Sequence, residues 1–207
     1  MRTERLVMRG WRESDREPFA RLNTDPEVME HFPERLSREQ SDAFADTIEA
    51  GFEERGWGLW ALEVDGTFIG YTGLQPVGFD AHFTPAVEIG WRLARDAWGH
   101  GYASEAGRAA AAYAFAELEL GELVSFTVPV NARSRAVMER IGMHYAGEIR
   151  SRGTAEGEHE VRDDVPYAVC VMLRANRDAC SIGTPSRALG DGGQRGGRST
   201  GLRARTT

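Results

Sequence analysis

Two glycines stand two residues apart, directly before a long alanine-rich stretch. The sequence WGHGYASEAGRAAAAY places Gly99 and Gly101 between an apolar run, residues 87–93, and a segment of helical composition. The first N–H groups of a helix have no partner within it, and the helix dipole is positive at this end. Glycines there let an anion approach the backbone closely. The spacing indicates either an anion cradle over residues 99–104 or an ordinary glycine-containing turn.

Two well-known phosphate motifs do not fit this segment. Ser104 stands where the dinucleotide fingerprint needs a third glycine or an alanine, and no strand with an acidic end follows at the required distance. The chain contains no lysine, which excludes Schiff-base chemistry and a phosphate loop of the GxxxxGK type. A dinucleotide-dependent oxidoreductase is therefore disfavoured.

A carboxylate interrupts the apolar run before the glycines. Glu88 lies in VEIGWRL, residues 87–93, which is expected to form a buried strand. Burying a carboxylate without a partner is costly, so Glu88 requires either a structural ion pair or a function.

Length and composition bound the class of protein. The 207 residues suit one domain, and 41% hydrophobic content is enough for a core. We expect a soluble, cytoplasmic protein without a membrane span or signal peptide. A net charge of -7 argues against general nucleic-acid binding and fits a basic substrate. Cys170 and Cys180 follow no metal or redox spacing, and we expect Cys170 to be buried and no structural disulfide.

The composition changes near residue 175. Residues 175–207 are rich in Gly and Arg and carry six arginines against two aspartates, a net charge of +4 that leaves -11 for the remainder. Such a segment cannot bury enough apolar surface to offset its ordering entropy, so we expect a disordered extension. RNA contact, or docking on the acidic remainder, is the alternative. Residues 1–174 then form one domain.

The order of elements indicates a mixed α/β fold. Helix starts are predicted at Ser14 and Ser37, each with the form of a capping box, and at Asp25, which precedes a proline. The helix after Ser37 is expected to run to about Glu54. A further long helix follows Gly101, and a short one runs from Asn131 to Gly142. Strands are expected at residues 5–11, 58–64, 67–74, 87–93, 123–130, around 144–150, and 165–173, with a hairpin turn at Asp65-Gly66.

These elements predict a largely antiparallel sheet flanked by helices, with helical insertions between the first two strands. The strands at residues 87–93 and 123–130 flank the long helix. A crossover helix joins parallel strands, so we expect these two strands alone to run parallel.

The motifs WGHGYASEA and NARSRAVMERIGM together resemble the GNAT superfamily of acetyl-CoA-dependent N-acetyltransferases, whose signature is Arg/Gln-x-x-Gly-x-Gly/Ala. Trp98 replaces the usual Arg or Gln. This replacement, with TERLVMRGW and DPEVMEHF, resembles the branch of ribosomal-protein alanine N-acetyltransferases, the Rim type. The resemblance covers residues 2–173 and implies a GNAT fold with splayed central strands.

The resemblance implies a site for acetyl-CoA as cosubstrate, without a metal. The pantetheine arm would bind backbone groups near Trp91 and Leu93, where the central strands splay. Asn131 would contact the same arm, with a plain N-cap as the alternative. Trp98 would contact the cofactor, and the pyrophosphate would lie on the loop that follows it, on the backbone amides of Gly99, His100, Gly101, Ala103 and Ser104.

The resemblance also implies catalytic roles. Glu88 would be the base that deprotonates the amine, directly or through water. Many members carry a tyrosine that acts as the acid at the position that Met138 occupies here. Ser134 stands where the Rim-type branch has a serine near the sulfur, so it becomes the candidate acid. Tyr145 is the second candidate for this role. No residue suggests an acyl-enzyme, so the amine is expected to attack the thioester directly in a ternary complex.

The acceptor remains open at this level. The Rim-type resemblance suggests a protein N-terminal amine; the alternatives are a small amine (amino acid, polyamine or aminoglycoside) and a non-catalytic CoA-binding sensor, which Met138 favours. Trp57 and Trp60 are either pocket or core residues. His159, Glu158 and Glu160 form an acidic stretch that either attracts a cationic acceptor or is merely solvated. A homodimer is one option for the oligomeric state.

Overall fold

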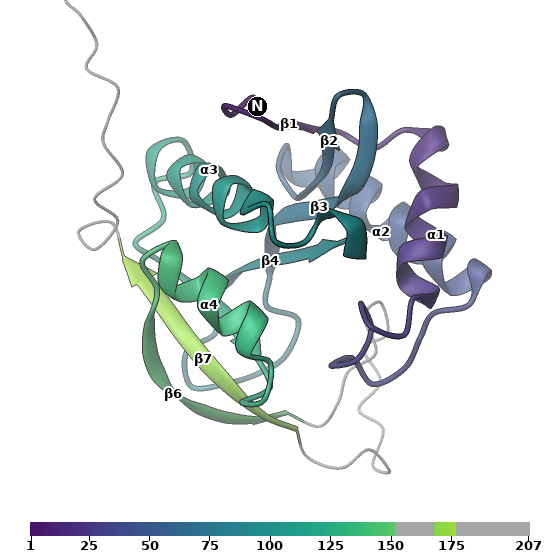
Figure 1. The fold of residues 1–207 in the computed structure, drawn as a ribbon. Helices are drawn as coiled ribbons and strands as arrows, with labels where there is room; N and C mark the ends of the chain where they lie inside the picture. The colour runs from purple at the N-terminus through teal and green to yellow at the C-terminus, as the bar shows by residue number, and fades with distance from the viewer. Residues whose placement is uncertain (152–167, 177–207) are drawn as a thin grey trace, which may run out of the picture.

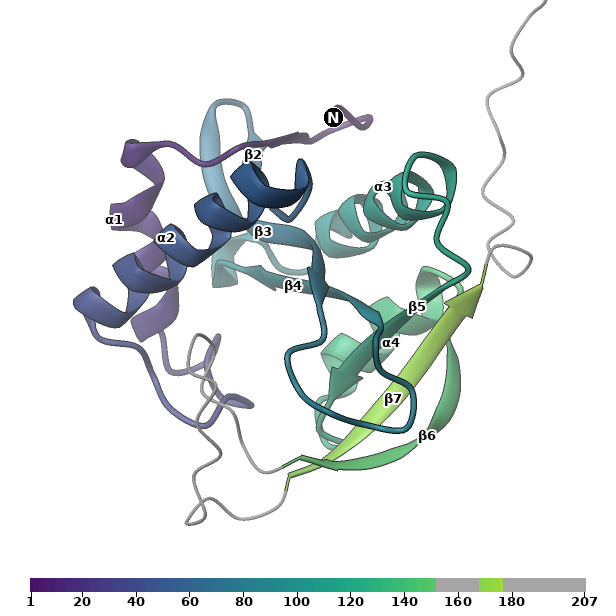
Figure 2. The same ribbon diagram turned by 180° about the vertical axis from the view of Figure 1, so that it is seen from behind.

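The computed structural model describes residues 1–151 and 168–176, and it places them in a seven-stranded sheet with helices on both faces (Figures 1 and 2). All neighbouring strands are antiparallel except the parallel pair β4–β5, as predicted. The spatial order is β1-β2-β3-β4-β5-β7-β6, with β1 at Val7–Arg9, β2 at Leu59–Val64, β3 at Thr67–Pro76, β4 at Val87–Leu93, β5 at Glu122–Thr127, β6 at His144–Ser151 and β7 at Ala168–Asn176. The predicted fold class is confirmed.

The helices divide between the two faces of the sheet. On one face, α3 (Tyr102–Ala116) and α4 (Ala132–Arg140) cover a core that includes Ile89 and Leu93 of β4. On the other, α1 (Arg16–Thr24) and α2 (Arg38–Arg55) cover an aromatic core around Tyr71 of β3. Short 3-10 turns at Glu13–Asp15 and Arg95–Ala97 precede α1 and α3. Since β4 lies between these two cores, its alternate residues face different helices.

Small residues bring α3 close to the sheet. Ala106, Ala110, Ala111 and Ala114 are each at most 2% exposed. A Cβ built on Gly107 would lie 3.3 Å from the Cγ2 of Ile141, just after α4. The alanine-rich composition therefore reflects close packing, and it fixes where the first turn of α3 lies relative to β4.

Two local predictions are confirmed. The hydroxyl of Ser37 accepts from the Gln40 N–H at 3.2 Å, and the Gln40 side chain accepts from the Ser37 N–H at 2.7 Å, which is a capping box at the start of α2. Asp65 and Gly66 have φ values of 49° and 81°, the left-handed pair that joins β2 to β3 in a two-residue hairpin.

A helix follows Ser14 as predicted, but it begins at Arg16 and lacks the expected capping box, and the helix start predicted at Asp25 is wrong. Ser14 lies within the first 3-10 turn, and the buried Asp15 accepts from the Arg12 N–H at 2.9 Å in its place. Asp25 opens no helix. Its Oδ1 accepts from the N–H groups of Glu27 and Val28 at 2.8 and 3.3 Å, and this local turn competes with a helix.

Strand ends differ from prediction by a few residues, and parts of the chain lie outside the description. β1 is shorter than residues 5–11, β5 ends at Thr127, and β7 continues to Asn176, two residues beyond the expected domain end at 174. The predicted acidic stretch at 158–160 and residues 177–207 of the expected extension lie outside the described residues, as does Cys180. Cys170 lies on β7.

Candidate active site

The glycine pair forms a left-handed loop in front of α3. Gly99 and Gly101 have φ values of 81° and 82°, a conformation that glycine adopts without strain. Gly101 is the N-cap of α3, and the first backbone bond of this helix joins the Glu105 N–H to the Gly101 carbonyl at 3.0 Å. The N–H groups of residues 102–104 therefore have no acceptor within the helix. The geometry fits an anion site at the positive end of the helix dipole.

The N-terminal segment holds this loop in place. The guanidinium of Arg5 donates to the His100 carbonyl at 2.8 Å and pairs with Glu105 at 2.6 Å. Glu105 also accepts from the Thr3 hydroxyl at 2.5 Å and from the Arg5 N–H at 2.9 Å. Burial raises the pKa of the Glu105 carboxyl, but these hydrogen bonds outweigh burial and hold that pKa below its ordinary value. The charge of Arg5 is thus largely used in fixing the loop.

Strands β4 and β5 separate immediately after they meet. Their aligned residues are Glu88 and Val124 alone, whereas β4 follows β3 along its whole length. The Ala94 N–H donates to Ile69 of β3 at 2.9 Å. Because direction alternates along a strand, the backbone groups of Leu93 and Trp91 point to the opposite edge, toward β5. This fork leaves a strand edge available to an extended ligand.

Trp98 supports the structure of the fork. Its indole Nε1 donates to the Leu93 carbonyl at 2.9 Å, and its ring packs against both hydrophobic cores. The bond ties the loop to the end of β4 and engages one of the backbone groups predicted to bind the cofactor arm. A direct contact of Trp98 with a cofactor stays a prediction.

The opposite face of β4 carries Glu88, Gly90 and Arg92. Gln75 of β3 donates to Glu88 at 3.0 Å, and Glu88 lies at the point where the fork opens. A Cβ built on Gly90 would meet nothing within 4 Å. There is consequently open space beside the carboxylate, on the face away from α3.

Arg92 joins this face to the helices that cover it. It is 3% exposed and donates to Asn23 of α1 at 2.7 Å, while Asn23 donates to Ser41 of α2 at 2.9 Å. The ring of Phe32, in the α1–α2 connection at residues 25–37, lies 4.0 Å from the guanidinium carbon. These contacts hold the connection over the open side of β4.

The first turn of α4 carries the other two predicted residues. Asn131 is its N-cap and accepts from the Ser134 N–H at 3.0 Å, so the capping alternative is confirmed for its side-chain oxygen. Ser134 is half-buried. The cofactor contact of Asn131 and the acid role of Ser134 stay predictions.

The remaining candidate residues lie in the core or at the surface. Met138 of α4 is fully buried, and Trp60, 7% exposed, packs in the same core against Tyr113. Tyr145 is 64% exposed on β6, two strands from β5, and its role as a reserve acid stays a prediction. The core reading of Trp60 is the correct one.

Sequence reasoning missed Arg5, Gly90 and the Arg92–Asn23–Ser41 chain. Each depends on a contact between segments far apart in the sequence, or on space that only the fold defines. The sequence offered one signal, which is that a charged residue inside an otherwise apolar strand needs a partner or a function. This signal applies to Arg92 as it did to Glu88.

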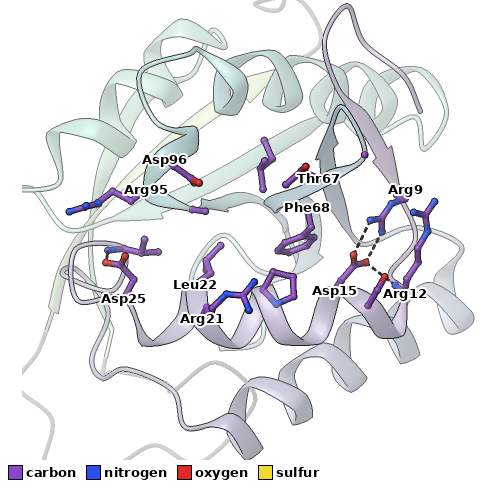
Figure 3. A pocket seen from close by; sticks show the side chains of 16 residues that line it. Arg9, Arg12, Asp15, Arg21, Leu22, Asp25, Thr67, Phe68, Arg95 and Asp96 are labelled. Atoms are coloured by element: carbon purple, nitrogen blue, oxygen red, sulfur yellow. Dashed lines mark hydrogen bonds and ion pairs between the residues drawn. The ribbon is translucent and has the colours of Figure 1, made fainter.

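A cleft of about 660 Å³ lies elsewhere, between α1, the β2–β3 turn and residues 94–96 (Figure 3). None of the predicted site residues lines it. Arg9 pairs with Asp15 across its wall at 2.6 Å, so this charge is satisfied internally.

No described helix is long and apolar enough to cross a membrane. Within residues 1–151 and 168–176, no group of three or more His, Cys, Asp or Glu side chains could hold a metal ion.

The family follows from comparison with known proteins. The acetyltransferase (GNAT) domain model matches residues 5–144, and the chain belongs to this family. It is an acetyl-CoA-dependent N-acetyltransferase.

Three relatives illustrate the match. YkkB of Bacillus subtilis is 33% identical over 151 residues, 72% of this chain and 87% of YkkB. The FsC-acetyl coenzyme A-N(2)-transacetylase of Aspergillus fumigatus is 31% identical over 171 residues, 76% of this chain and 73% of that enzyme. The putative ribosomal N-acetyltransferase YdaF of B. subtilis is 30% identical over 123 residues, 58% of this chain and 66% of YdaF.

Solved structures share the fold. An acetyltransferase from Agrobacterium tumefaciens has a TM-score of 0.66 and 25% identity, covering 86% of this chain and 94% of its own. Spermidine N-acetyltransferase from Vibrio cholerae, in complex with CoA and spermine, has a TM-score of 0.64 and 16% identity, covering 84% of this chain and 97% of its own. RimJ from Mycobacterium smegmatis, in complex with CoA-disulfide, has a TM-score of 0.63 and 17% identity over 84% and 82%.

Proposed function

We propose that this enzyme transfers the acetyl group of acetyl-CoA directly to the N-terminal amine of a protein, in a ternary complex. The observation that carries the proposal is the β4–β5 fork, with the glycine loop at its open end and Glu88 at its closed end. A site of this form supplies backbone groups for an extended thioester and a carboxylate where that thioester would end.

The cofactor fits along the edge of β4. Its pyrophosphate would lie on the amides of the loop, at residues Gly99, His100, Gly101, Ala103 and Ser104, and its arm would follow Leu93 and Trp91 as an added strand. Five residues of strand span about 17 Å, a length similar to that of an extended pantetheine arm. The thioester would then lie near Glu88, with Asn131 and Ser134 of α4 on its other side.

The acceptor would enter over Gly90. Glu88 takes a proton from the amine, whose nitrogen forms a bond to the thioester carbon, and a backbone N–H of the fork donates to the carbonyl oxygen as negative charge develops there. The carbon–sulfur bond then breaks, and Ser134 donates a hydrogen bond to the departing thiolate. CoA leaves as the thiol once the proton that Glu88 took from the amine has passed through solvent to the sulfur, which restores the carboxylate. A serine suits this role because donation to a developing anion depends on placement.

Charge and one relative support a protein N-terminus. The α1–α2 connection, which covers the acceptor face, exposes three glutamates, Glu27, Glu30 and Glu34, of which Glu27 pairs with Arg95. A cationic segment of a basic protein complements them, and YdaF, 30% identical, is named a putative ribosomal N-acetyltransferase. The A. fumigatus relative is named an N(2)-transacetylase, and this favours a second candidate acceptor, a small-molecule amine. We extend the proposal to a cytoplasmic location.

Thiol release distinguishes these acceptors. The protein is incubated with acetyl-CoA and either peptides with free N-termini, basic and acidic, or a panel of amino acids, polyamines and aminoglycosides. We expect the highest kcat/KM for basic peptides, and blocking their N-termini should abolish release. Release with a small amine alone would replace the first candidate by the second.

A further inference from the structure

Arg133 places a guanidinium beside the glycine loop. This residue belongs to the first turn of α4, and its guanidinium carbon lies 4.5 Å from the centre of the Trp98 ring. Trp98 directly precedes Gly99, and its indole is fixed by the bond to the Leu93 carbonyl. A side chain from α4 is thus held across the mouth of the fork, over the residue that leads into the loop.

The charge of Arg133 is not neutralised by the residues that the structure describes around it. In residues 1–151 and 168–176, no carboxylate lies within 4.0 Å of this guanidinium, whereas Arg5, which donates to the His100 carbonyl in the loop, pairs with Glu105 at 2.6 Å. Arg133 is also exposed, so it retains its capacity to bind an anion. Stacking on the half-buried Trp98 ring leaves the N–H groups in the guanidinium plane available.

We propose that Arg133 binds the pyrophosphate of acetyl-CoA, with Trp98 as the platform that orients it. Trp98 occupies the position where the signature Arg/Gln-x-x-Gly-x-Gly/Ala carries Arg or Gln, and the cation is supplied to this place from α4. The proposal rests on the cofactor site of the proposed function. Arg133 and the loop amides then bind the same anion from two sides.

Titration calorimetry with three ligands tests this assignment. CoA, dephospho-CoA, which lacks the 3′-phosphate, and pantetheine, which has no phosphate, are each titrated into the wild type and into Arg133→Ala. Arg135→Ala is the matched control, because Arg135 lies in the same turn, is exposed, and donates to the Pro129 carbonyl at 3.0 Å. Arg133→Gln serves as a second variant that keeps most of the stack.

A charge-assisted contact predicts a tenfold to hundredfold weaker Kd, as is typical for the loss of one such bond, for CoA and dephospho-CoA alike in both Arg133 variants. Pantetheine affinity should be unchanged, Arg135→Ala should bind like the wild type, and the loss should shrink as salt is raised. An equal loss for pantetheine would show a structural role, and a loss confined to CoA would move the contact to the 3′-phosphate. Either result, or unchanged binding in the Arg133 variants, overturns the proposal. If the wild type itself fails to bind CoA, the cofactor site of the proposed function is wrong.

Discussion

Along β4, neighbouring residues serve opposite faces of the sheet. Ile89 and Leu93 fill the core beneath α3, whereas Glu88, Gly90 and Arg92 face α1 and α2. The sequence could predict that Glu88 has a partner or a function, because a carboxylate in an apolar strand needs one. It could not predict the space beside Gly90, since that space depends on helices more than 30 residues away in the chain.

A side chain at Gly90 should obstruct the acceptor and spare the cofactor. The Cβ position is open and the backbone there is ordinary strand, so Gly90→Val should leave Tm unchanged or slightly raised. We expect kcat/KM for the acceptor to fall at least tenfold, with the Kd of acetyl-CoA unaltered. Gly10→Val, which also meets open space but lies beyond β1, is the control. Full acceptor activity in Gly90→Val would place the entry route elsewhere.

Removal of the Ser134 hydroxyl tests the acid assignment. Loss of one donor to a developing charge should lower kcat of Ser134→Ala by roughly tenfold to hundredfold. Acetyl-CoA binding should be retained, because the Asn131 cap uses the backbone N–H of residue 134 and not its side chain. An unchanged kcat would leave Ser134 as a helix-surface serine.

The depressed pKa of Glu105 predicts a pH-dependent contribution to stability. A carboxyl with a lower pKa in the folded than in the unfolded state stabilises the fold above its unfolded pKa, and this contribution is lost as pH falls through the folded pKa. Glu105→Gln should therefore cost about 1 kcal/mol at pH 7, a value reduced for partial exposure. Denaturant unfolding should show the difference from wild type shrinking as the pH is lowered below the ordinary carboxyl range. A difference independent of pH would contradict the linkage.

At the scale of elements, periodicity and turn chemistry were sufficient for most of the fold. The hairpin at Asp65-Gly66 and the helix after Ser37 were predictable because each is determined by its own residues. The helix start predicted at Asp25-Pro26 was wrong, because an Asp followed by proline starts a turn as readily as a helix. The fork was expected from the family resemblance, and its location at Glu88 required the register of β4 against β5.

The two capping-box patterns make a matched pair for stability. Ser37→Ala removes the hydroxyl that accepts the Gln40 N–H and should cost about 1 kcal/mol. Ser14→Ala should cost almost nothing, because Ser14 is exposed within a 3-10 turn and is not the N-cap of α1. Chemical denaturation of both variants measures the difference. Equal losses would show that Ser14 does cap α1.

For the whole molecule, the elements converge on one place. The N-terminal segment reaches the loop through Arg5, α4 reaches it through Arg133, and α1 and α2 reach β4 through Arg92. Assignment of residues 1–174 to one acetyltransferase domain stays a prediction, as does the role of residues 175–207. The acceptor could not be predicted at this scale, because acceptor choice depends on side chains of connections rather than on the shared fold.

The most direct test of the account is thiol release by Glu88→Gln. This substitution keeps the shape of the side chain and its contact with Gln75 but removes the basic group. With the preferred acceptor, we expect kcat to fall by about a hundredfold or more, while calorimetry shows acetyl-CoA bound as tightly as by the wild type. Wild-type rates in Glu88→Gln would contradict the assignment of the base at the fork, and with it the proposed direction of acceptor entry.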